Sequence, residues 1–569
     1  MGLINRRAWL GLAAGAAAAP AMAATAAGTR PWAVTIPSPG QGDYAGAIER
    51  IRACAEQEMT VWGLPGMTLA ITDERGFEAI ISLGWADRGA RKAVQPGHYF
   101  QIGSISKSFA GLALFRLADQ GKLDLSAPAA RVLPGAAWPD DPGVTVARLL
   151  SHTSGLPGNA PIFPPAPDQT LWTGFAPGSG FSYSNTAYAL LGKVLTQLTG
   201  LSTPQALQDL VMRPLGLTGM LSVIRSADRH LFPLSYWPAL SDRAPLVGGP
   251  LDRAPWVESD FAAGSISATA AMMARYARFL MAAGRGQGGP LMSDAAMARF
   301  VKPQTPAEEF GKGARYAHGL AVTVLDDHDC LFHTGGMVSF NSALTVDPVS
   351  GVGAFASVNA GLIPYRPRAT TNYACQVLRA VVEGRPLPDL PTISREAPVE
   401  NAADYLGVYG QGSRFEVKPA GQGLALDGPQ GHARMELAGP DVFSTDDGSF
   451  APLGLRFVRE GEKVIGCWCG GTFYGRGGAA GPPADPRLRA LAGTYFSNSP
   501  WEGIVRVFAQ GEELVMGGAI LKPAPDGTWR FEDPELACER VRFEAPLSGR
   551  PSRLSLSGSW FERLEDGVQ

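Results

Sequence analysis

Several kinds of chemistry are missing from this sequence. It has no run of Lys and Arg, and its formal net charge is -3, so we expect no nucleic-acid partner. The six cysteines form no Cys-x-x-Cys pair and no zinc-type spacing with histidine. We therefore expect mostly buried thiols and no bound metal, and the sequence assigns no disulfide. Beyond the N-terminus, no apolar segment is long enough to span a membrane.

Several sequence motifs are also missing. Neither His-Glu-x-x-His nor Gly-x-Ser-x-Gly occurs, which argues against a zincin and an α/β-hydrolase. The stretch GRGQGG, residues 284–289, lacks the Lys-Ser/Thr pair that follows a phosphate-binding loop. The acidic run DDHDC, residues 326–330, suggests a metal site, but it separates two strand-like runs and is more typical of a polar hairpin turn. No cofactor is implied.

The N-terminus has the pattern of an export signal. Residues 1–23 combine Arg6-Arg7, an alanine-rich apolar stretch and an A-x-A cleavage site at 21–23. The arginine pair followed by Ala-Trp-Leu favours a twin-arginine signal peptide, and an ordinary secretory signal is the alternative. Both predict a bacterial protein that starts near Ala24, has no membrane span when mature, and works in the periplasm or as a secreted protein.

The 569 residues are enough for more than one hydrophobic core. The predicted elements of the first part are, in chain order, a helix at 42–63, two strands at 66–87, helices and loops at 130–300, three or four strands at 316–359 and a helix at 365–384. This order predicts an α/β domain over residues 24–385. We expect a largely antiparallel sheet flanked by helices, with a helical lobe.

The second part of the chain has a different character. After a proline-rich linker at 386–400, short alternating segments replace the helical periods. Two echoes, DYLGVYG at 404 and ALAGTYF at 490, each open a segment of similar length. We predict two small all-β, barrel-like domains at 401–478 and 485–569.

Ser104 and Lys107 stand three residues apart at the start of a helix-like stretch, so both side chains are predicted on one helix face. A serine hydroxyl becomes a nucleophile when a base lies beside it, and the positive end of a helix stabilises the developing charge. Lysine serves as the base where burial lowers its pKa. Taken alone, the pair favours the simpler interpretation of a helix cap.

Two further motifs follow in order along the chain. Tyr183-Ser184-Asn185 precedes a helix-like run, and His333-Thr334-Gly335 lies on a late strand. The series S-x-x-K, S-D-N and K-T-G marks class A β-lactamases and penicillin-binding proteins. Here tyrosine replaces the first serine of the second motif, and histidine replaces the lysine of the third.

On these motifs the chain resembles the serine β-lactamase and penicillin-binding-protein-like superfamily. It is closest to the class C-type branch, which includes esterases and D-aminopeptidases. The phrases LLSHTSGLP at 149, PLGLTGM at 214 and GSISATAAMMARYARFL at 264 also fit, so the resemblance covers roughly residues 42–385. It implies the fold and an acyl-enzyme mechanism. Two C-terminal β-barrels are likewise a feature of the D-aminopeptidases.

The resemblance implies catalytic roles by position. Ser104 would be the nucleophile, and Lys107 would orient or deprotonate it. Tyr183 would share the base role, then protonate the leaving group or activate water. Asn185 would hydrogen-bond Lys107 or the substrate amide.

It also implies how the substrate is bound. The backbone N–H groups of Ser104 and Gly336 would form the oxyanion hole. His333, with Gly335 in the same motif, would take the electrostatic and hydrogen-bonding role that lysine has in K-T-G. Outside the motifs, His152 is expected to fix a loop by hydrogen bonds.

Histidine at position 333 affects the expected substrate. Near neutral pH it is often uncharged, which disfavours substrates with a C-terminal carboxylate. We therefore expect a serine hydrolase whose partner is a small-molecule ester or a peptide: small esters or D-amino-acid amides and peptides rather than β-lactams. A β-lactamase, a D-alanyl-D-alanine carboxypeptidase, a non-catalytic cell-wall peptide-binding protein and a lipocalin-like ligand binder are the alternatives. The oligomeric state stays open.

Overall fold

The computed structural model of the protein describes residues 30–40, 42–161, 171–395, 398–412, 414–547 and 549–564. The predicted signal segment, residues 1–23, lies outside them. Contacts divide the described chain into two compact units. The first holds the described residues up to Trp237 together with Leu251–Ile393, and the second holds Pro238–Pro250 and the residues from Ser394 on.

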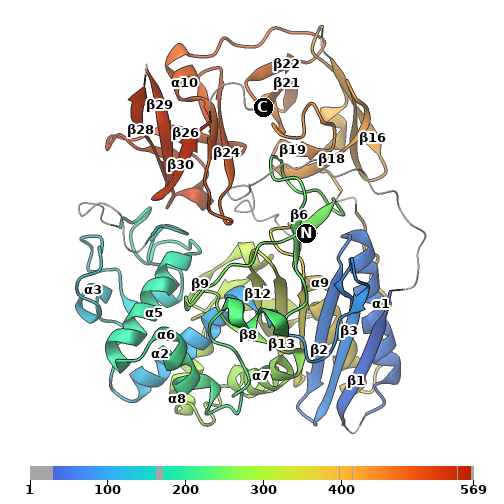
Figure 1. Cartoon of the computed structure of the whole chain (residues 1–569), viewed down its shortest axis with the longest axis vertical. Helices are drawn as coiled ribbons and strands as arrows, with labels where there is room; N and C mark the ends of the chain where they lie inside the picture. The colour runs from blue at the N-terminus through green and yellow to red at the C-terminus, as the bar shows by residue number, and fades with distance from the viewer. Residues whose placement is uncertain are drawn as a thin grey trace. The chain divides into compact units, whose positions relative to one another are not determined.

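A ten-stranded antiparallel sheet forms the centre of the first unit (Figure 1). Its order is β1 (Trp32–Pro39), β3 (Phe77–Asp87), β2 (Gly66–Asp73), β14 (Val352–Val358), β13 (Asn341–Asp347), β12 (His328–Gly336), β11 (Ala321–Leu325), β10 (Arg315–Tyr316) and β9 (Thr305–Pro306), with β4 (Lys92–Ala93) beside β3. The strands predicted at 66–87 and 316–359 are confirmed. They join where β2 pairs with β14. Strand β1 was not predicted.

Helices cover both faces of this sheet, as predicted. One face carries α1 (Ala45–Val61) and α9 (Arg368–Val382), which confirm the helices expected at 42–63 and 365–384. The other face carries α7 (Ala270–Gly284), which shares a core with α2 (Ser106–Asp119), α5 (Asn185–Thr199) and α8 (Asp294–Val301). Every residue of β14 is buried, because its alternate side chains enter the two cores.

Short elements complete the helical lobe and its loops. They are α3 (Ala129–Val132), α4 (Val146–Leu150), α6 (Thr203–Leu207), the single π-helical turn η3 (Gln208–Met212), the 3₁₀ turns η4 (Ser226–Leu231) and η5 (Glu308–Phe310), and the strands β6 (Tyr236–Pro238), β7 (Leu251–Arg253) and β8 (Ser267–Ala268).

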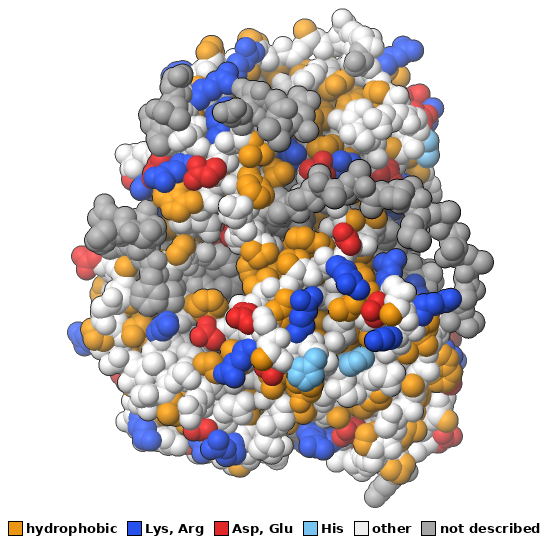
Figure 2. Space-filling view, in the orientation of Figure 1, with side chains coloured by type: hydrophobic (Ala, Val, Ile, Leu, Met, Phe, Trp, Pro, Cys, Tyr) orange, Lys and Arg blue, Asp and Glu red, His pale blue; other side chains and the backbone are white. Residues whose placement is uncertain are grey.

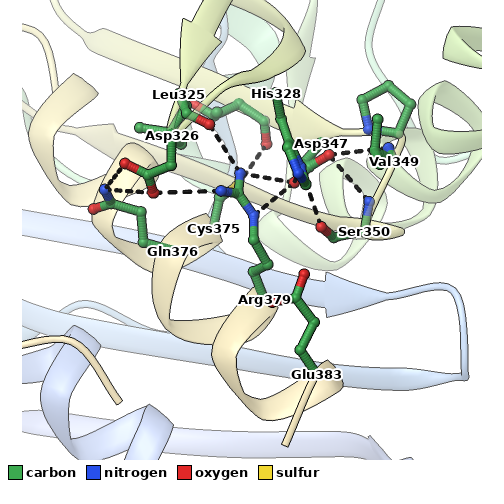
Figure 3. Close-up of polar contacts among 12 residues, drawn as sticks. Leu325, Asp326, His328, Asp347, Val349, Ser350, Cys375, Gln376, Arg379 and Glu383 are labelled. Atoms are coloured by element: carbon green, nitrogen blue, oxygen red, sulfur yellow. Dashed lines mark hydrogen bonds and ion pairs between the residues drawn. The ribbon is translucent and has the colours of Figure 1, made fainter. Parts of the chain in front are cut away.

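The acidic stretch 326–330 is a hairpin turn, as predicted, and its charges are matched by an arginine (Figure 3). Buried Asp347 accepts hydrogen bonds from Arg379 Nε and from His328 Nδ1, both at 2.9 Å. Arg379 also contacts Asp326 at 3.3 Å. One guanidinium thus contacts two carboxylates and ties α9 to the end of the sheet.

Two eight-stranded β-structures fill most of the second unit. The first comprises β15 (Gly407–Tyr409), β16 (Phe415–Ala420), β17 (Gly423–Gly428), β18 (Gly431–Gly439), β19 (Val442–Thr445), β20 (Leu455–Glu460), β21 (Lys463–Cys469) and β22 (Thr472–Gly475). A bridge between Tyr409 and Arg476 joins its first and last strands, so it is barrel-like, as predicted. The second is a closed barrel of β23 (Gly493–Phe496), β24 (Ile504–Gln510), β25 (Glu513–Met516), β26 (Ala519–Pro523), β27 (Trp529–Phe531), β28 (Arg540–Leu547), β29 (Arg550–Leu556) and β30 (Ser559–Arg563).

The two sequence echoes mark a structural repeat. A short helical turn opens each β-structure: η6 (Ala402–Tyr405) precedes β15, and α10 (Pro486–Leu491) precedes β23. Fully buried Tyr409 donates its hydroxyl to the Tyr405 carbonyl at 2.7 Å, and fully buried Tyr495 donates to the Leu491 carbonyl at 2.8 Å. The shared G-x-Y pattern therefore has a local purpose. The tyrosine ties the first strand to the turn four residues earlier.

The surface and the cysteines fit the composition. In the space-filling view, Lys and Arg side chains are interspersed with Asp and Glu (Figure 2). All six cysteines lie among the described residues and are buried, as expected. Among the described residues, none of the helices combines the length and the apolar character needed to cross a membrane.

Candidate active site

Ser104 lies in a 3₁₀ turn that leads directly into an α-helix. After β5 (Phe100–Gln101), the chain makes a 3₁₀ turn, η2 (Gly103–Ile105), and α2 begins only at Ser106. The sequence predicted that Ser104 belongs to the first turn of the helix. The backbone stays helical from Ile105 into Ser106, so this 3₁₀ turn is the first turn of the helical segment, and Gly103 begins it with a left-handed φ of +54°. Ser104 remains partly exposed, whereas Lys107 one turn later is fully buried.

This turn lies directly against the end of β12. A Cβ atom at Gly335 would lie 1.9 Å from the Ile102 carbonyl oxygen, and one at Gly103 would lie 2.7 Å from the backbone nitrogen of Gly336. Only glycine allows two backbones to approach so closely. The packing therefore brings the N–H of Gly336 beside the turn that carries Ser104. These are the two residues predicted to form the oxyanion hole.

Lys107 is the centre of the polar network. Its Nζ donates to Ser104 Oγ at 3.0 Å, to Asn185 Oδ1 at 2.7 Å and to the Ala263 carbonyl at 2.8 Å. It also lies 4.8 Å from the centre of the Tyr183 ring. The structure thus brings Ser104, Lys107, Tyr183 and Asn185 together.

The partners of Lys107 suit a proton acceptor. A carbonyl and an amide oxygen only accept hydrogen bonds, so the Ala263 and Asn185 oxygens each hold one N–H of the lysine. The remaining tetrahedral position of Nζ points at Ser104. It holds a third proton when Lys107 is an ammonium, and a lone pair facing the serine hydroxyl when Lys107 is an amine. Proton transfer between Ser104 and Lys107 therefore needs no rearrangement.

His152 fixes the loop that carries Tyr183, as expected from the sequence. This buried residue accepts the Ser184 N–H at its Nδ1, at 3.0 Å, and accepts the Ser182 N–H at its carbonyl, also at 3.0 Å. Its own backbone is left-handed, with φ of +59°. Ser184 in turn caps α5 by accepting the Ala187 N–H at 3.0 Å. Tyr183 is therefore held from both sides.

His333 lies on β12 within the same cluster. Its ring centre is 6.2 Å from that of Tyr183, and the side chain is 1% exposed. Tyr316 OH lies 3.0 Å from its Nε2, and the Thr334 carbonyl lies 2.6 Å from its Nδ1. Burial and the nearby Lys107 ammonium lower the pKa of His333 to about 3.

Three contributors to the site escaped the sequence analysis. The Ala263 carbonyl is a backbone group, so no residue type indicates it, although the sequence that starts at Gly264 resembles the superfamily. Tyr316 stood at the start of a strand-like run without any motif. The third, Arg366, follows β14. A Cβ at Gly336 would lie 2.3 Å from its Nη2 atom, and burial lowers its pKa to about 10. A cation therefore lies beside the strand that carries the third motif.

Comparison with known proteins agrees with this geometry. The sequence model of the family described as Beta-lactamase matches residues 51–378. Penicillin-binding protein 4 of Amycolatopsis lactamdurans is 30% identical over 324 residues, which cover 52% of this chain and 82% of that protein. Esterase EstB of Burkholderia gladioli is 29% identical over 218 residues, covering 34% of this chain and 55% of the esterase.

A solved structure supports the fold. The octameric penicillin-binding protein homologue from Pyrococcus abyssi aligns with a TM-score of 0.53 and 20% identity, over 82% of this chain and 98% of that one. The match to Penicillin-binding protein 4* of Bacillus subtilis covers only 33% of that protein. The chain therefore spans between a third and about four-fifths of these three curated relatives.

Proposed function

Because this chain belongs to the beta-lactamase family of serine hydrolases, we propose that it cleaves an ester or amide bond through an acyl-enzyme formed on Ser104. One observation carries the proposal. Lys107 Nζ is held 3.0 Å from Ser104 Oγ by two oxygens that only accept hydrogen bonds. A helix cap would require no buried amine beside the serine, so this contact favours catalysis over capping.

The proposed reaction has two half-steps. Ser104 Oγ attacks the substrate carbonyl as its proton passes to Lys107 in the amine form, while the N–H groups of Ser104 and Gly336 stabilise the oxyanion. Tyr183 relays that proton to the leaving group, and the alcohol or amine departs. Water then attacks the acyl-enzyme while Tyr183 relays one of its protons to the Lys107 amine. The acyl–Oγ bond breaks, the carboxylic acid departs, and Lys107 returns that proton to Ser104 Oγ.

The preferred substrates are small esters or D-amino-acid amides and peptides rather than β-lactams. The support is the third motif, where histidine replaces lysine and where burial lowers the pKa of His333 to about 3. The motif then offers no full positive charge to a substrate carboxylate. The esterase among the relatives is consistent with this preference.

The first test is hydrolysis of p-nitrophenyl butyrate by the full chain, beside Ser104→Ala and Ser106→Ala. Ser106 is a matched control because it is a buried serine two residues away, whose Oγ accepts the Ile266 N–H at 3.1 Å. We expect hydrolysis and labelling by an active-serine probe to vanish in Ser104→Ala and to persist in Ser106→Ala. Labelling that survives in Ser104→Ala would refute the mechanism.

A substrate panel separates the alternatives. Turnover of nitrocefin faster than of any ester would favour a β-lactamase, and release of D-alanine from D-alanyl-D-alanine peptides would favour a carboxypeptidase. A folded protein that reacts with no acylating probe but binds cell-wall peptides would be a non-catalytic binder.

We also propose that the hydrolase domain covers residues 24–385, that two β-domains follow at 401–478 and 485–569, and that the protein is exported through the twin-arginine route. Cell fractionation tests the export proposal. Replacing Arg6 and Arg7 by lysine is expected to leave the precursor in the cytoplasm. Normal export of that variant would favour the ordinary secretory signal.

A further inference from the structure

His333 is surrounded by groups from four different elements. Tyr316 comes from β10, Phe310 from η5, Tyr183 from the loop before α5 and Lys107 from α2. Of these four neighbours only Lys107 can carry a positive charge, while the Arg366 guanidinium lies beside Gly336, three residues on, and the Glu309 carboxylate acts on Tyr316. His333 and Tyr316 are 1% and 0% exposed, so solvent does not compete for their hydrogen bonds.

The hydrogen-bond partners of His333 decide where its proton lies. The Thr334 carbonyl, 2.6 Å from Nδ1, has no proton to give, so Nδ1 must carry the hydrogen. With Nδ1 protonated, the Nε2 of a neutral ring is an acceptor, and the Tyr316 hydroxyl at 3.0 Å donates to it. The Tyr188 hydroxyl, which donates to the Leu150 carbonyl at 2.7 Å, is a second acceptor beside Tyr316 and competes for the same proton. The opposite tautomer would place a nitrogen lone pair against the carbonyl oxygen.

The same geometry accommodates an imidazolium, whose Nε2–H would donate to the Tyr316 oxygen. Two features disfavour that charged form. The ring is buried, and the Lys107 side chain faces it in a site with little exposure to water. In the neutral and in the protonated form alike, both ring nitrogens hydrogen-bond to protein groups, so neither is available to a substrate.

We propose that Tyr316 is a positioning residue that, with the Thr334 carbonyl, holds His333 as the neutral Nδ1–H tautomer, so that the third motif selects substrates without a carboxylate next to the scissile bond. This inference rests on the proposed function and deepens it. A lysine in this position would carry a charge, whereas His333 contributes a buried neutral ring. The ring fills the space beside Lys107 without adding a second positive charge.

The tautomer is measurable without any enzyme activity. The chain has only seven histidines, so ¹⁵N-histidine labelling of the full chain gives few signals, and His333→Gln assigns the one that disappears. We expect a protonated Nδ1 and a bare Nε2 for His333, unchanged between pH 7.5 and pH 5. An Nε2–H tautomer, or a titration midpoint near pH 6, would overturn the proposal.

Tyr316→Phe tests the positioning role. We expect the His333 signals to change to a mixture of tautomers or to begin to titrate. Tyr276→Phe is the matched control, since Tyr276 is equally buried and its hydroxyl contacts Ser108 Oγ at 2.6 Å, far from this pair in sequence. We expect it to leave the His333 signals unchanged. Unchanged His333 signals in Tyr316→Phe would show that the tyrosine does not hold the tautomer.

Selectivity tests the consequence for substrates. We compare kcat/KM for phenyl butyrate with that for 3-carboxyphenyl butyrate, whose carboxylate lies on the leaving group. The wild type is expected to favour the neutral ester, and His333→Lys is expected to raise the anionic-to-neutral ratio about tenfold or more. A wild type that prefers the anionic ester would overturn the proposal. Absence of all hydrolysis would instead refute the proposed function, while the tautomer pattern would still stand.

Discussion

Replacing Gly335 by alanine should disable the site through backbone geometry alone. A Cβ at this position would lie 1.9 Å from the Ile102 oxygen, 2.8 Å from the Ile102 carbonyl carbon and 3.2 Å from the Gly103 Cα. All three are backbone atoms, so no side chain can rotate away. The φ of Gly335 is not left-handed, so alanine meets no intrinsic backbone strain there.

The required movement sets the size of the effect. Ordinary van der Waals contact begins at 3.4 Å, so the methyl group must gain about 1.5 Å (3.4 minus 1.9) from the Ile102 oxygen. That shift separates the Ser104 turn from the strand that carries the Gly336 N–H. A misplacement of about 1 Å costs roughly 10²-fold in rate. We therefore expect kcat to fall at least about 100-fold, with a loss of stability of about 1–3 kcal/mol from overpacking.

The assay measures kcat for p-nitrophenyl butyrate, normalised to the number of active sites that react with an active-serine probe. It is run at a temperature at which circular dichroism shows that the variant is folded. Gly97→Ala is the matched control. A Cβ there has no atom within 4 Å, and the backbone is not left-handed, so wild-type kcat and stability are expected. If folded Gly335→Ala kept kcat within threefold of wild type, the assignment of this contact to the oxyanion hole would be wrong.

Three further predictions concern other parts of the site and its support. Tyr183→Phe should lower kcat by about 10²–10⁴-fold with an unchanged melting curve, and normal turnover would remove Tyr183 from the proton relay. Burial lowers the pKa of His318 to about 4, while an unfolded histidine binds a proton below about pH 6.5. His318 by itself should therefore contribute a loss of about 3 kcal/mol in the free energy of unfolding between pH 6.5 and pH 4, and urea titrations of His318→Gln should show a loss that is smaller by that amount. Arg379→Met leaves buried Asp347 without its guanidinium, so the free energy of unfolding measured by urea titration should fall by about 3–5 kcal/mol. Arg487→Met, which removes an exposed ion pair, is the control and should change it by less than about 1 kcal/mol.

Much of the fold could be predicted because the sequence patterns that specify its helices and strands are local. Helical and strand periods predicted α1, α9 and the strand pairs on both sides of the helical lobe. The echo at 404 and 490 predicted two β-structures, because the same tyrosine makes the same local hydrogen bond in each. Strand β1 was missed. Its side chains are mostly exposed, so it carries no alternating apolar pattern.

The candidate site also has a part that the sequence predicted and a part that it did not. The residue types and order of the three motifs identified Ser104, Lys107, Tyr183, Asn185 and His333, and the structure brings these residues together. The 3₁₀ form of the first turn was not predicted, since a left-handed Gly103 and its close packing against β12 depend on tertiary structure.

The sequence by itself therefore determined which chemical groups this protein carries and on which kind of element each one lies. Tertiary structure alone decided what surrounds them. Lys107 takes a hydrogen-bond acceptor from Ala263, 156 residues away, and His333 takes its partner from Tyr316 on another strand. Any residue can supply a backbone carbonyl, so the sequence does not indicate which one is used. A tyrosine in a strand is most simply interpreted as a core residue. Such contacts arise only when packing brings distant segments within 3 Å, and local periodicity carries no information about that distance.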